Sequence, residues 1–380
     1  MKPRIGVLTS GGDCPGLNAV LRAVVLAADK LGWEVVGFRD GFEGLLPPGN
    51  HVIVDRQAVN GIMALGGTIL GTTNRGHFVA KVGAGDRTIV SAKIIADARK
   101  ILEDLGVRAL IVVGGDGSLV TAQQLQEAGI NCIGVPKTID NDLEATATTF
   151  GFDSAVDVVV DGLDRLHTTA TSHRRVIVVE VMGRHAGWIA LQGGIAGGAD
   201  IILIPEIPFD NGKIADVIKA REAAGYLGTV VVVAEGARPK HGEQVKRDVE
   251  GGEFRLGGIG EIVAREIAMR TGKETRCCVL GHLQRGGAPT TLDRILATRF
   301  GVKAVQLANE GHFGSMVSLP KLPGTSRAYS RSRQSPEACP AKRRVGANRA
   351  GCRHFVWRLI QGCRVRCPQG RPVATMREVR

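Results

Sequence analysis

Short apolar runs alternate with longer amphipathic stretches along residues 4–320 of the chain. The runs are rich in β-branched residues and lead into glycine-containing turns, a pattern typical of buried strands in a parallel sheet. The clearest runs are Ile5–Leu8, Leu110–Val113, Cys132–Val135, Val176–Val181, Ile201–Ile204, Val230–Ala234 and Cys277–Leu280. Between them, Ala19–Leu31 and Ile94–Leu105 carry apolar residues three and four positions apart and predict helices. The alternation predicts an α/β fold with largely parallel sheets.

The length of the chain, 380 residues, predicts two doubly wound domains, since one domain usually takes about 100 to 200 residues. Residues 321–380 break the pattern, because they hold 15 Lys/Arg against two Asp/Glu and show a period of neither 2 nor 3.6. We interpret residues 320–380 as an irregular, disordered basic tail whose composition is typical of out-of-frame translation of GC-rich DNA. The coding DNA in its other two frames would test this frameshift.

Two other interpretations of the tail are a basic arm that binds nucleic acid or a membrane, and a metal site. The metal interpretation would use four side chains whose spacing matches no standard zinc pattern, namely Cys352, His354, Cys363 and Cys367. The net charge of +12 comes from the tail, because residues 1–320 hold 34 basic and 35 acidic residues. We therefore expect no nucleic-acid partner for the body of the chain.

No run of about 18 apolar residues is present, so we expect no membrane partner. The start Met1–Arg4 shows no signal-peptide pattern, which predicts a cytoplasmic protein. Cysteines of the body lack the spacing of metal ligands and are interpreted as reduced core or loop thiols; they are Cys14, Cys132, Cys277 and Cys278.

Two glycine-rich turns follow predicted strands. In Thr9–Asn18, glycines let backbone amides approach a polyphosphate, although the turn matches neither the P-loop nor the dinucleotide fingerprint and could be a plain strand-to-helix connection. In Gly114–Ser118, the glycine at 117 leaves room beside Asp116, whose carboxylate can hold magnesium or simply cap a helix. The second turn resembles those of NAD kinases and lipid kinases, which indicates phosphoryl transfer without naming the acceptor.

The third turn, Pro136–Asp142, carries two carboxylates two positions apart, Asp140 and Asp142. Like charges at this spacing are costly unless a cation or an acidic proton lies between them. One carboxylate can accept the proton of an attacking hydroxyl while the other assists a metal. The turn therefore predicts catalysis.

With these turns in view, the chain resembles the 6-phosphofructokinase family, in its bacterial ATP-dependent type, over residues 4 to about 319. The motifs GGDCPG, GGDG, PKTIDND, VEVMGRHAGW, VVAEGA and ETRCCVLGHLQRGG occur in the family's order and approximate spacing. The resemblance implies phosphorylation of fructose 6-phosphate at the 1-hydroxyl by ATP with Mg²⁺, in a homo-oligomer, a tetramer or a dimer. It also implies a larger nucleotide-binding domain, residues 1–151 with 285–319, and a smaller sugar-phosphate-binding domain, residues 152–284.

The resemblance further implies roles for single residues. Asp140 would be the general base, Thr138 would orient the transferred phosphoryl group, and Arg184 would stabilise its charge. Gly12 completes the catalytic set, and Asp142 and Asp116 would serve the metal. ATP would contact Gly11, Gly12, Arg75, Gly115, Asp116, Gly117 and Ser118. The sugar phosphate would contact Thr138, Asp140, Asp142, Arg175, Met182, Gly183, Arg184, Glu235, Arg276, His282 and Arg285.

In the family, the equivalents of Arg175 and Arg276 reach in from a neighbouring subunit. The phosphoryl donor depends on two positions with opposite implications. Gly117 favours ATP, because an acidic side chain there would occupy and repel the α-phosphate, whereas Lys137 is typical of pyrophosphate users. We predict ATP as donor and keep two alternatives, a reversible pyrophosphate-dependent enzyme and a catalytically silent regulatory paralogue.

Overall fold

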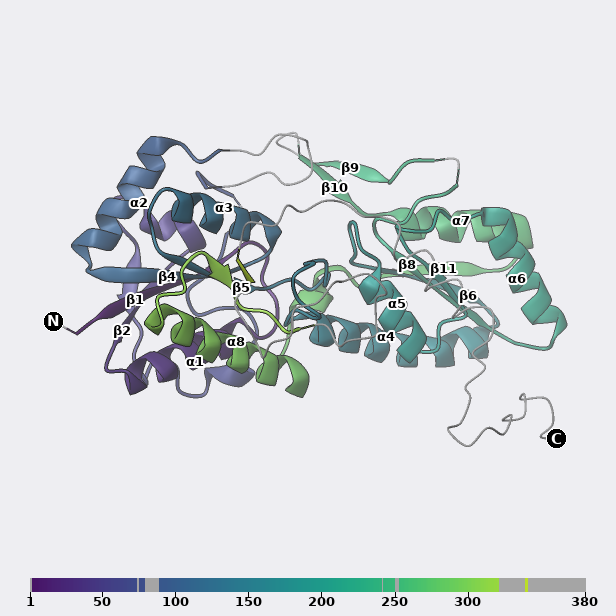
Figure 1. The fold of residues 1–380 in the computed structure, drawn as a ribbon. Coiled ribbons are helices and arrows are strands. Elements are labelled where there is room, and N and C mark those ends of the chain that lie inside the picture. Colours follow the sequence, from purple (N-terminus) through teal and green to yellow (C-terminus); the bar gives the residue numbers. More distant parts are fainter. Residues whose placement is uncertain are drawn as a thin grey trace, which may run out of the picture.

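The computed structural model describes residues 2–73, 75–78, 89–240, 242–249, 253–320 and 339–340. Two sheets form the centres of two lobes that lie side by side (Figure 1). The predicted irregular tail, with the cysteines and histidine of the metal interpretation, lies outside the described residues except at Pro320 and Cys339–Pro340. Among the described residues no helix is both long and apolar enough to cross a membrane.

Seven strands of the described residues form the first sheet, in the order β13-β12-β5-β4-β1-β2-β3. The central pairs are parallel, because helical crossovers connect them, whereas β3 and β13 pair antiparallel with β2 and β12. The strands are β1 (Arg4–Ser10), β2 (Glu34–Phe38), β3 (His51–Ile53), β4 (Val107–Gly114), β5 (Cys132–Pro136), β12 (Ser315–Met316) and β13 (Cys339–Pro340).

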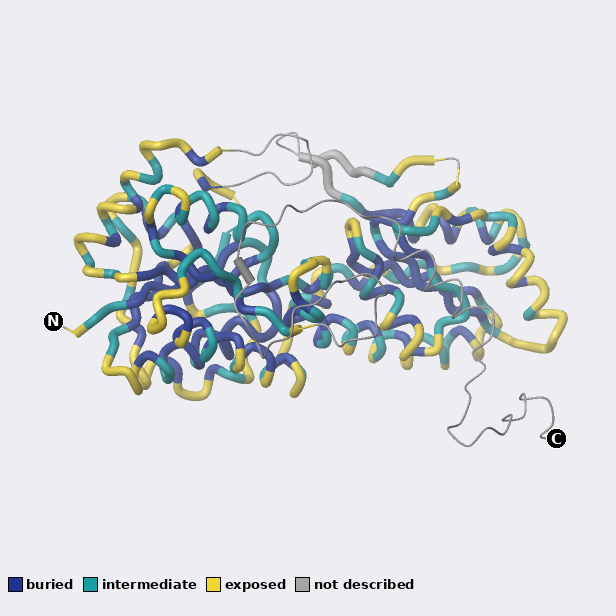
Figure 2. Tube along the Cα trace, in the orientation of Figure 1, coloured by how far each residue is buried: buried dark blue, intermediate teal, exposed yellow. Residues whose placement is uncertain are grey.

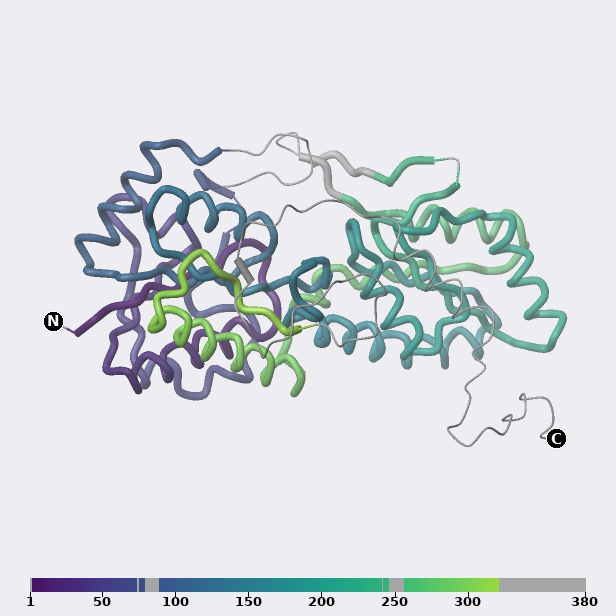
Figure 3. Tube along the Cα trace, in the orientation of Figure 1, coloured from purple at the N-terminus to yellow at the C-terminus, as the bar shows by residue number. Residues whose placement is uncertain are grey.

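Helices cover both faces of the first sheet (Figure 1). One face carries α1 (Leu17–Lys30) and α8 (Thr291–Asn309), and the other carries α2 (Ala92–Asp104) and α3 (Asp116–Glu127). Short 3₁₀ helices follow β2 and β3, namely η1 (Gly41–Leu45) and η2 (Ile62–Ala64). Figure 3 shows that α8 returns from the second lobe and lies beside α1, so the first lobe is built from both ends of the described chain.

The second sheet is parallel throughout, in the order β11-β6-β8-β7. Its strands are β6 (Val176–Val181), β7 (Ile201–Leu203), β8 (Thr229–Ala234) and β11 (Thr275–Val279), and β9 (Lys246–Val249) pairs separately with β10 (Glu253–Leu256). The helices α4 and α5 lie on one face, and α6 and α7 on the other (Figure 1). Their bounds are α4 (Phe152–His173), α5 (Trp188–Ala196), α6 (Asn211–Ala223) and α7 (Ile259–Thr271), and η3 (Gly281–Arg285) leads back to the first lobe.

A buried apolar cluster extends beneath both sheets. It includes Val20 on α1 and Ile133 on β5, and it continues through Val159 on α4 to Val179 on β6. Figure 2 shows this buried interior running through both lobes, with exposed residues confined to the outer surfaces. Two further clusters fill the opposite faces, under α2 and α3 and under α6 and α7.

All seven predicted strands and both predicted helices are confirmed, with ends that differ by a few residues. One expectation is wrong: Cys277–Leu280 was expected to be buried on both faces, but β11 begins at Thr275 and is half-buried, with Val279 51% exposed. The reason is its place at the sheet edge, where one neighbour is missing. The short strand at 339–340 was not predicted. It pairs with β12 through backbone groups alone, so no pattern of side chains indicates it. The domain boundaries at residues 151 and 284 stay predictions.

Candidate functional site

The three predicted turns lie next to one another, because β1, β4 and β5 are neighbours and parallel strands end at the same edge of a sheet. The Lys137 backbone N–H donates to the carbonyl oxygen of Gly114 at 3.0 Å, which joins the third turn to the second. The Ser118 hydroxyl donates to Ser10 Oγ at 3.0 Å, which joins the second turn to the first. The edge is therefore one connected surface of loop backbone and short side chains.

A cavity of about 200 Å³ opens at this edge. It contains every residue that the resemblance assigned to the nucleotide, together with Lys137 and an aromatic pair; the lining is Ser10, Gly11, Gly12, Phe42, Glu43, Thr73, Arg75, Phe78, Gly115, Asp116, Gly117, Ser118, Thr121 and Lys137. Phe42 and Phe78 stack with ring centroids 5.4 Å apart. One part of the cavity is therefore glycine backbone and cation, and another part is aromatic.

The glycines of the first turn are required by its geometry. Gly11 has φ +83°, in the left-handed region, and its N–H donates to the carbonyl oxygen of Thr73 at 3.0 Å. A Cβ on Gly12 would lie 2.9 Å from Nη1 of Arg285, so a side chain there would displace the guanidinium. Lys137 Nζ donates to the carbonyl oxygen of Gly12, which fixes a buried amino group under the turn, and burial lowers the pKa of that group.

Asp116 is the first residue of α3, with Gly115 as the N-cap. Its carboxylate lines the cavity at a helix N-terminus, where N–H groups and the helix dipole favour phosphate oxygens. In the described part of the chain no group of three or more His, Cys, Asp or Glu could hold a metal alone. A single carboxylate such as that of Asp116 fits Mg²⁺, which typically takes one or two protein carboxylates and completes its shell with water and substrate phosphates.

The acidic turn after β5 is held in shape by its own hydrogen bonds. The Thr138 hydroxyl donates to Asp142 Oδ1 at 3.2 Å and accepts from the Asp140 N–H at 3.1 Å. Asn141 has φ +50°, and its side-chain oxygen accepts from the Thr149 N–H at 3.1 Å. These bonds hold the Asp142 carboxylate and the backbone of the turn in place.

The pKa of Asp140 is raised to about 6, first by burial and then by the charge of Asp142, against the opposing effects of Arg285, Lys137 and Arg184. A carboxylate with this pKa is ionised at neutral pH and still basic enough to accept a proton. Asp140 does not line the cavity, whereas Lys137, three positions earlier, does. Asp140 therefore lies outside the cavity lining, on the same turn as Lys137.

Turns of the second sheet carry several of the residues that the resemblance assigned to the sugar phosphate. Met182 and Gly183 follow β6, and Glu235 follows β8. The Glu235 backbone N–H donates to the carbonyl oxygen of Val181 at 2.8 Å. Burial raises the pKa of Glu235 to about 7, and the charge of Asp140 also raises it. The end of β8 therefore faces the acidic turn of the first sheet.

The predicted cradle for the sugar phosphate is not assembled within one chain. Arg285 donates to the carbonyl oxygen of Asp13 at 3.0 Å, against the first turn, and His282 is exposed on η3. Arg175 and Arg276 lie at the amino ends of β6 and β11, which is the opposite end of the second sheet. Seven residues separate Arg175 from Met182, which at about 3.3 Å per residue is roughly 20 Å.

Sequence reasoning missed several residues that support the site. Gln284 is fully buried, and its side-chain oxygen accepts from the Met182 N–H at 3.2 Å. Glu180 is buried on β6 and accepts from the N–H groups of Gly258 and Gly260 at the start of α7. Both residues stand inside quoted motifs, so their positions were visible, but their tertiary partners were not.

Comparisons with known proteins agree on one family. The family profile described as Phosphofructokinase matches residues 4–308. The ATP-dependent 6-phosphofructokinase of Chloroflexus aggregans is 54% identical over 318 residues, which cover 84% of this chain and 87% of that protein. The pyrophosphate--fructose 6-phosphate 1-phosphotransferase of Streptomyces coelicolor is 51% identical over 321 residues, covering 83% and 90%.

Two solved structures share the fold. Phosphofructokinase from Saccharomyces cerevisiae superposes with a TM-score of 0.72 at 33% identity, covering 83% of this chain and 43% of that chain. Pyrophosphate-dependent phosphofructokinase from Marinobacter aquaeolei superposes with a TM-score of 0.69 at 26% identity, covering 83% and 78%. The family profile spans most of the chain, and the relatives match it over most of their own length. Together with the three joined turns, these matches show that the chain belongs to the phosphofructokinase family.

Proposed function

We propose that this chain transfers the γ-phosphoryl group of ATP to the 1-hydroxyl of fructose 6-phosphate in the cytoplasm, giving fructose 1,6-bisphosphate. The observation that carries the proposal is Asp140, a carboxylate with a pKa of about 6 beside Arg285, Lys137 and Arg184. It adjoins a cavity lined by glycine backbone and a helix N-terminus, which suits a polyphosphate. A base next to the end of a polyphosphate is the arrangement that a sugar kinase needs.

In this proposal Asp140 accepts the hydroxyl proton as the new bond to phosphorus forms. Thr138 keeps the turn in place and orients the phosphoryl group, and Arg184 stabilises its charge with the backbone of Gly12. Asp116, with Asp142 in support, would hold Mg²⁺, which when bound neutralises charge on the phosphates. Because Gly12, Asp116 and Asp140 follow the ends of three neighbouring strands, little rearrangement is needed to align them.

On the sugar side, Met182, Gly183 and Glu235 would contact the sugar, and His282 and Arg285 would contact its phosphate. A sugar phosphate dianion is poorly satisfied without paired cationic donors. Arg175 and Arg276 lie roughly 20 Å from this place in their own chain. We therefore propose that a second copy of the chain supplies them, so that the working enzyme is a homo-oligomer.

ATP is the favoured donor because the cavity holds more than a phosphate site. The stacked pair Phe42 and Phe78 offers apolar surface that suits a nucleoside, and pyrophosphate has no group to use it. Gly117 leaves room for the α-phosphate. The second candidate is pyrophosphate, favoured by the buried amino group of Lys137 and by the 51% identity to the Streptomyces coelicolor enzyme.

The test is an assay of the purified chain with fructose 6-phosphate, Mg²⁺ and either ATP or pyrophosphate. We expect turnover with ATP and little with pyrophosphate. Strict use of pyrophosphate would overturn the donor, and no turnover with either donor would favour a silent paralogue. Binding of fructose 6-phosphate, measured by calorimetry, separates a silent paralogue from a protein that does not recognise the sugar at all.

A further inference from the structure

Glu274 lies between the two arginines that the proposed function assigns to the sugar phosphate of a neighbouring copy. Its Oε2 is 2.7 Å from Nε of Arg175, and its Oε1 is 2.6 Å from Nη2 of Arg276. One carboxylate therefore contacts both guanidinium groups, one with each oxygen. No residue role described above accounts for this contact.

The backbone fixes this arrangement before any ligand binds. Arg276 stands opposite Ile177 in the parallel pairing of β11 with β6. The N–H of Val176, the residue after Arg175, donates to the carbonyl oxygen of Glu274 at 3.0 Å. The three side chains therefore start from adjacent points on two paired strands, and Glu274 and Arg276, two positions apart, project on the same side.

Electrostatics explains why a carboxylate is needed there. Two guanidinium groups carry like charges and repel each other when both face one phosphate. The close ion pair with Arg175 and the charges of Arg276 and His173 hold the pKa of Glu274 below its usual value, so it is ionised at neutral pH. Each guanidinium has five N–H donors, so a contact to one nitrogen leaves donors for a phosphate.

We propose that Glu274 is a positioning residue that holds Arg175 and Arg276 together as a preformed phosphate clamp for a sugar phosphate bound in a second copy of the chain. This inference rests on the proposed function, because it takes fructose 6-phosphate as the ligand. The alternative is that the Glu274 carboxylate occupies the position of the phosphate between the two arginines and competes with it. The two arrangements predict opposite effects of removing the charge.

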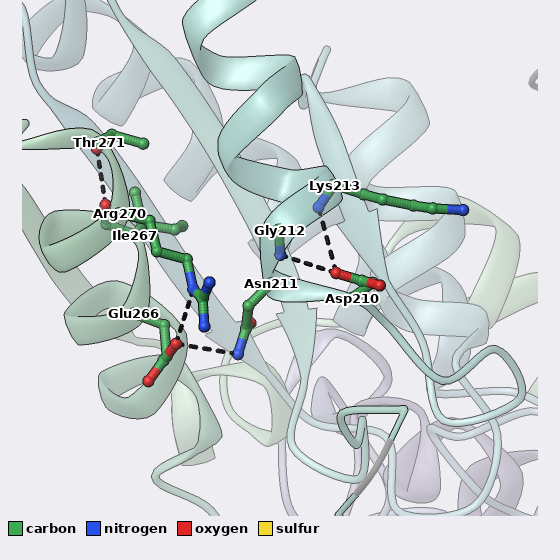
Figure 4. A network of polar contacts seen from close by, with 8 residues as sticks. All are labelled: Asp210, Asn211, Gly212, Lys213, Glu266, Ile267, Arg270 and Thr271. Atoms are coloured by element: carbon green, nitrogen blue, oxygen red, sulfur yellow. Dashed lines mark hydrogen bonds and ion pairs between the residues drawn. The ribbon is translucent and has the colours of Figure 1, made fainter.

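The test compares two variants that remove the same charge. Glu274→Gln removes the clamp's carboxylate. Glu266→Gln is the control, because Glu266 also contacts an arginine in the same lobe, at 3.0 Å from Nε of Arg270, and belongs to a network with Asn211 that no proposed role involves (Figure 4). Because the clamp acts on binding, we expect Glu274→Gln to raise KM for fructose 6-phosphate by roughly tenfold with kcat and the KM for ATP unchanged.

Glu266→Gln is expected to leave all three constants unchanged. Glu274→Asp keeps the charge on a shorter side chain and should give an intermediate KM, and it replaces the Gln variant if that variant does not fold. Analytical ultracentrifugation would check that the variants assemble like the wild type. An unchanged or lowered KM overturns the clamp while leaving the kinase intact, and a wild-type chain that neither binds nor phosphorylates fructose 6-phosphate overturns the proposed function and the clamp together.

Discussion

Asp140 takes its properties from neighbours on several segments. Its pKa is raised by burial and by Asp142, from its own turn, and is lowered by Arg285, which comes from η3, and by Lys137. Because the cations keep the pKa near 6 despite the burial, the carboxylate is ionised at pH 7 but not strongly solvated. These opposing contributions make it the residue whose replacement is most informative.

Asp140→Asn retains the shape of the side chain and removes its basicity. We expect kcat to fall by roughly 10²- to 10⁴-fold, the usual contribution of a general base, while the affinity for fructose 6-phosphate changes little. Steady-state kinetics gives kcat, and calorimetry gives the affinity. A kcat within tenfold of the wild type would show that another group takes the proton.

The pH dependence of kcat/KM gives a second measurement on the same carboxylate. Asp140 must be ionised to accept a proton, so kcat/KM should fall below about pH 6, the pKa of the free protein. The charge of Asp142 raises that pKa, so Asp142→Asn should move the acid limb to lower pH, whatever its effect on the maximal rate. An acid limb that stays in place would mean that a different group controls it.

At this scale, local pattern was enough to predict that the residues of the glycine-rich turns lie together, but it did not predict the contacts of the cationic side chains. Gly11, Asp116 and Ser118 stand next to strand ends, so local pattern sufficed to bring them together. Arg285 contacts Asp13, 272 positions away, and a contact of this kind has no local pattern. The same is true of Glu274, whose ion pairs depend on the register of two strands.

Among the elements, the starts of α4 and α8 are joined by buried hydrogen bonds. Asp293, in the first turn of α8, accepts from the Ser154 N–H at 2.8 Å and from the Ser154 hydroxyl at 2.6 Å. The Thr290 hydroxyl caps α8 and contacts Asp153 Oδ2 at 2.6 Å. Each helix therefore supplies polar partners for the N-terminus of the other, where the chain passes between the lobes.

Asp293→Ala should lower the free energy of unfolding by about 1 to 3 kcal/mol, because it leaves buried donors of Ser154 without an acceptor. Asp293→Asn keeps one acceptor oxygen and should cost less. Asp161→Asn, which removes an exposed carboxylate on α4 paired with Arg165 across one turn, is the control and should leave the unfolding midpoint unchanged. Urea unfolding followed by circular dichroism measures all three, and equal midpoints for the Asp293 variants and the wild type would contradict the argument.

Prediction of elements succeeded where one signal dominated. Fully buried strands such as β6 and β8 read as unbroken apolar runs, so their positions followed from pattern alone. β3 lies at a sheet edge, where exposure mixes polar and apolar residues and hides the run. β11, at the edge of the other sheet, was predicted as a strand, but its partial exposure was not predicted. The start of α6 was not predicted, although Asp210 accepts from the Gly212 N–H at 2.8 Å as its N-cap (Figure 4), because a capping residue also occurs in ordinary turns.

At the scale of the whole molecule, the proposed catalytic turns of the first sheet face the carboxyl end of β8, whereas the proposed clamp lies at the amino ends of β6 and β11, at the opposite end of the second sheet. An active site that needs both must therefore combine Asp140 of one copy with Arg276 of another. Asp140→Asn and Arg276→Ala chains, each nearly inactive alone, should regain activity when they are mixed and reassembled, because some sites then contain both wild-type residues.

The matched control mixes Asp140→Asn with Asp116→Ala. Both residues lie at the end of the first sheet of one chain, so no mixed assembly contains an intact site and no recovery is expected. Activity of the mixture is read with fructose 6-phosphate and ATP. Equal recovery in both mixtures, or none in either, would contradict a site shared between copies.

The apolar cluster that runs beneath both sheets also determines how the molecule melts. Residues such as Val20 and Val179 belong to one uninterrupted hydrocarbon layer, although they come from different lobes. Neither lobe can lose its packing without exposing surface of the other, so the two are thermodynamically coupled. Scanning calorimetry should therefore record a single endotherm, and two resolved peaks would mean that the lobes are independent folding units.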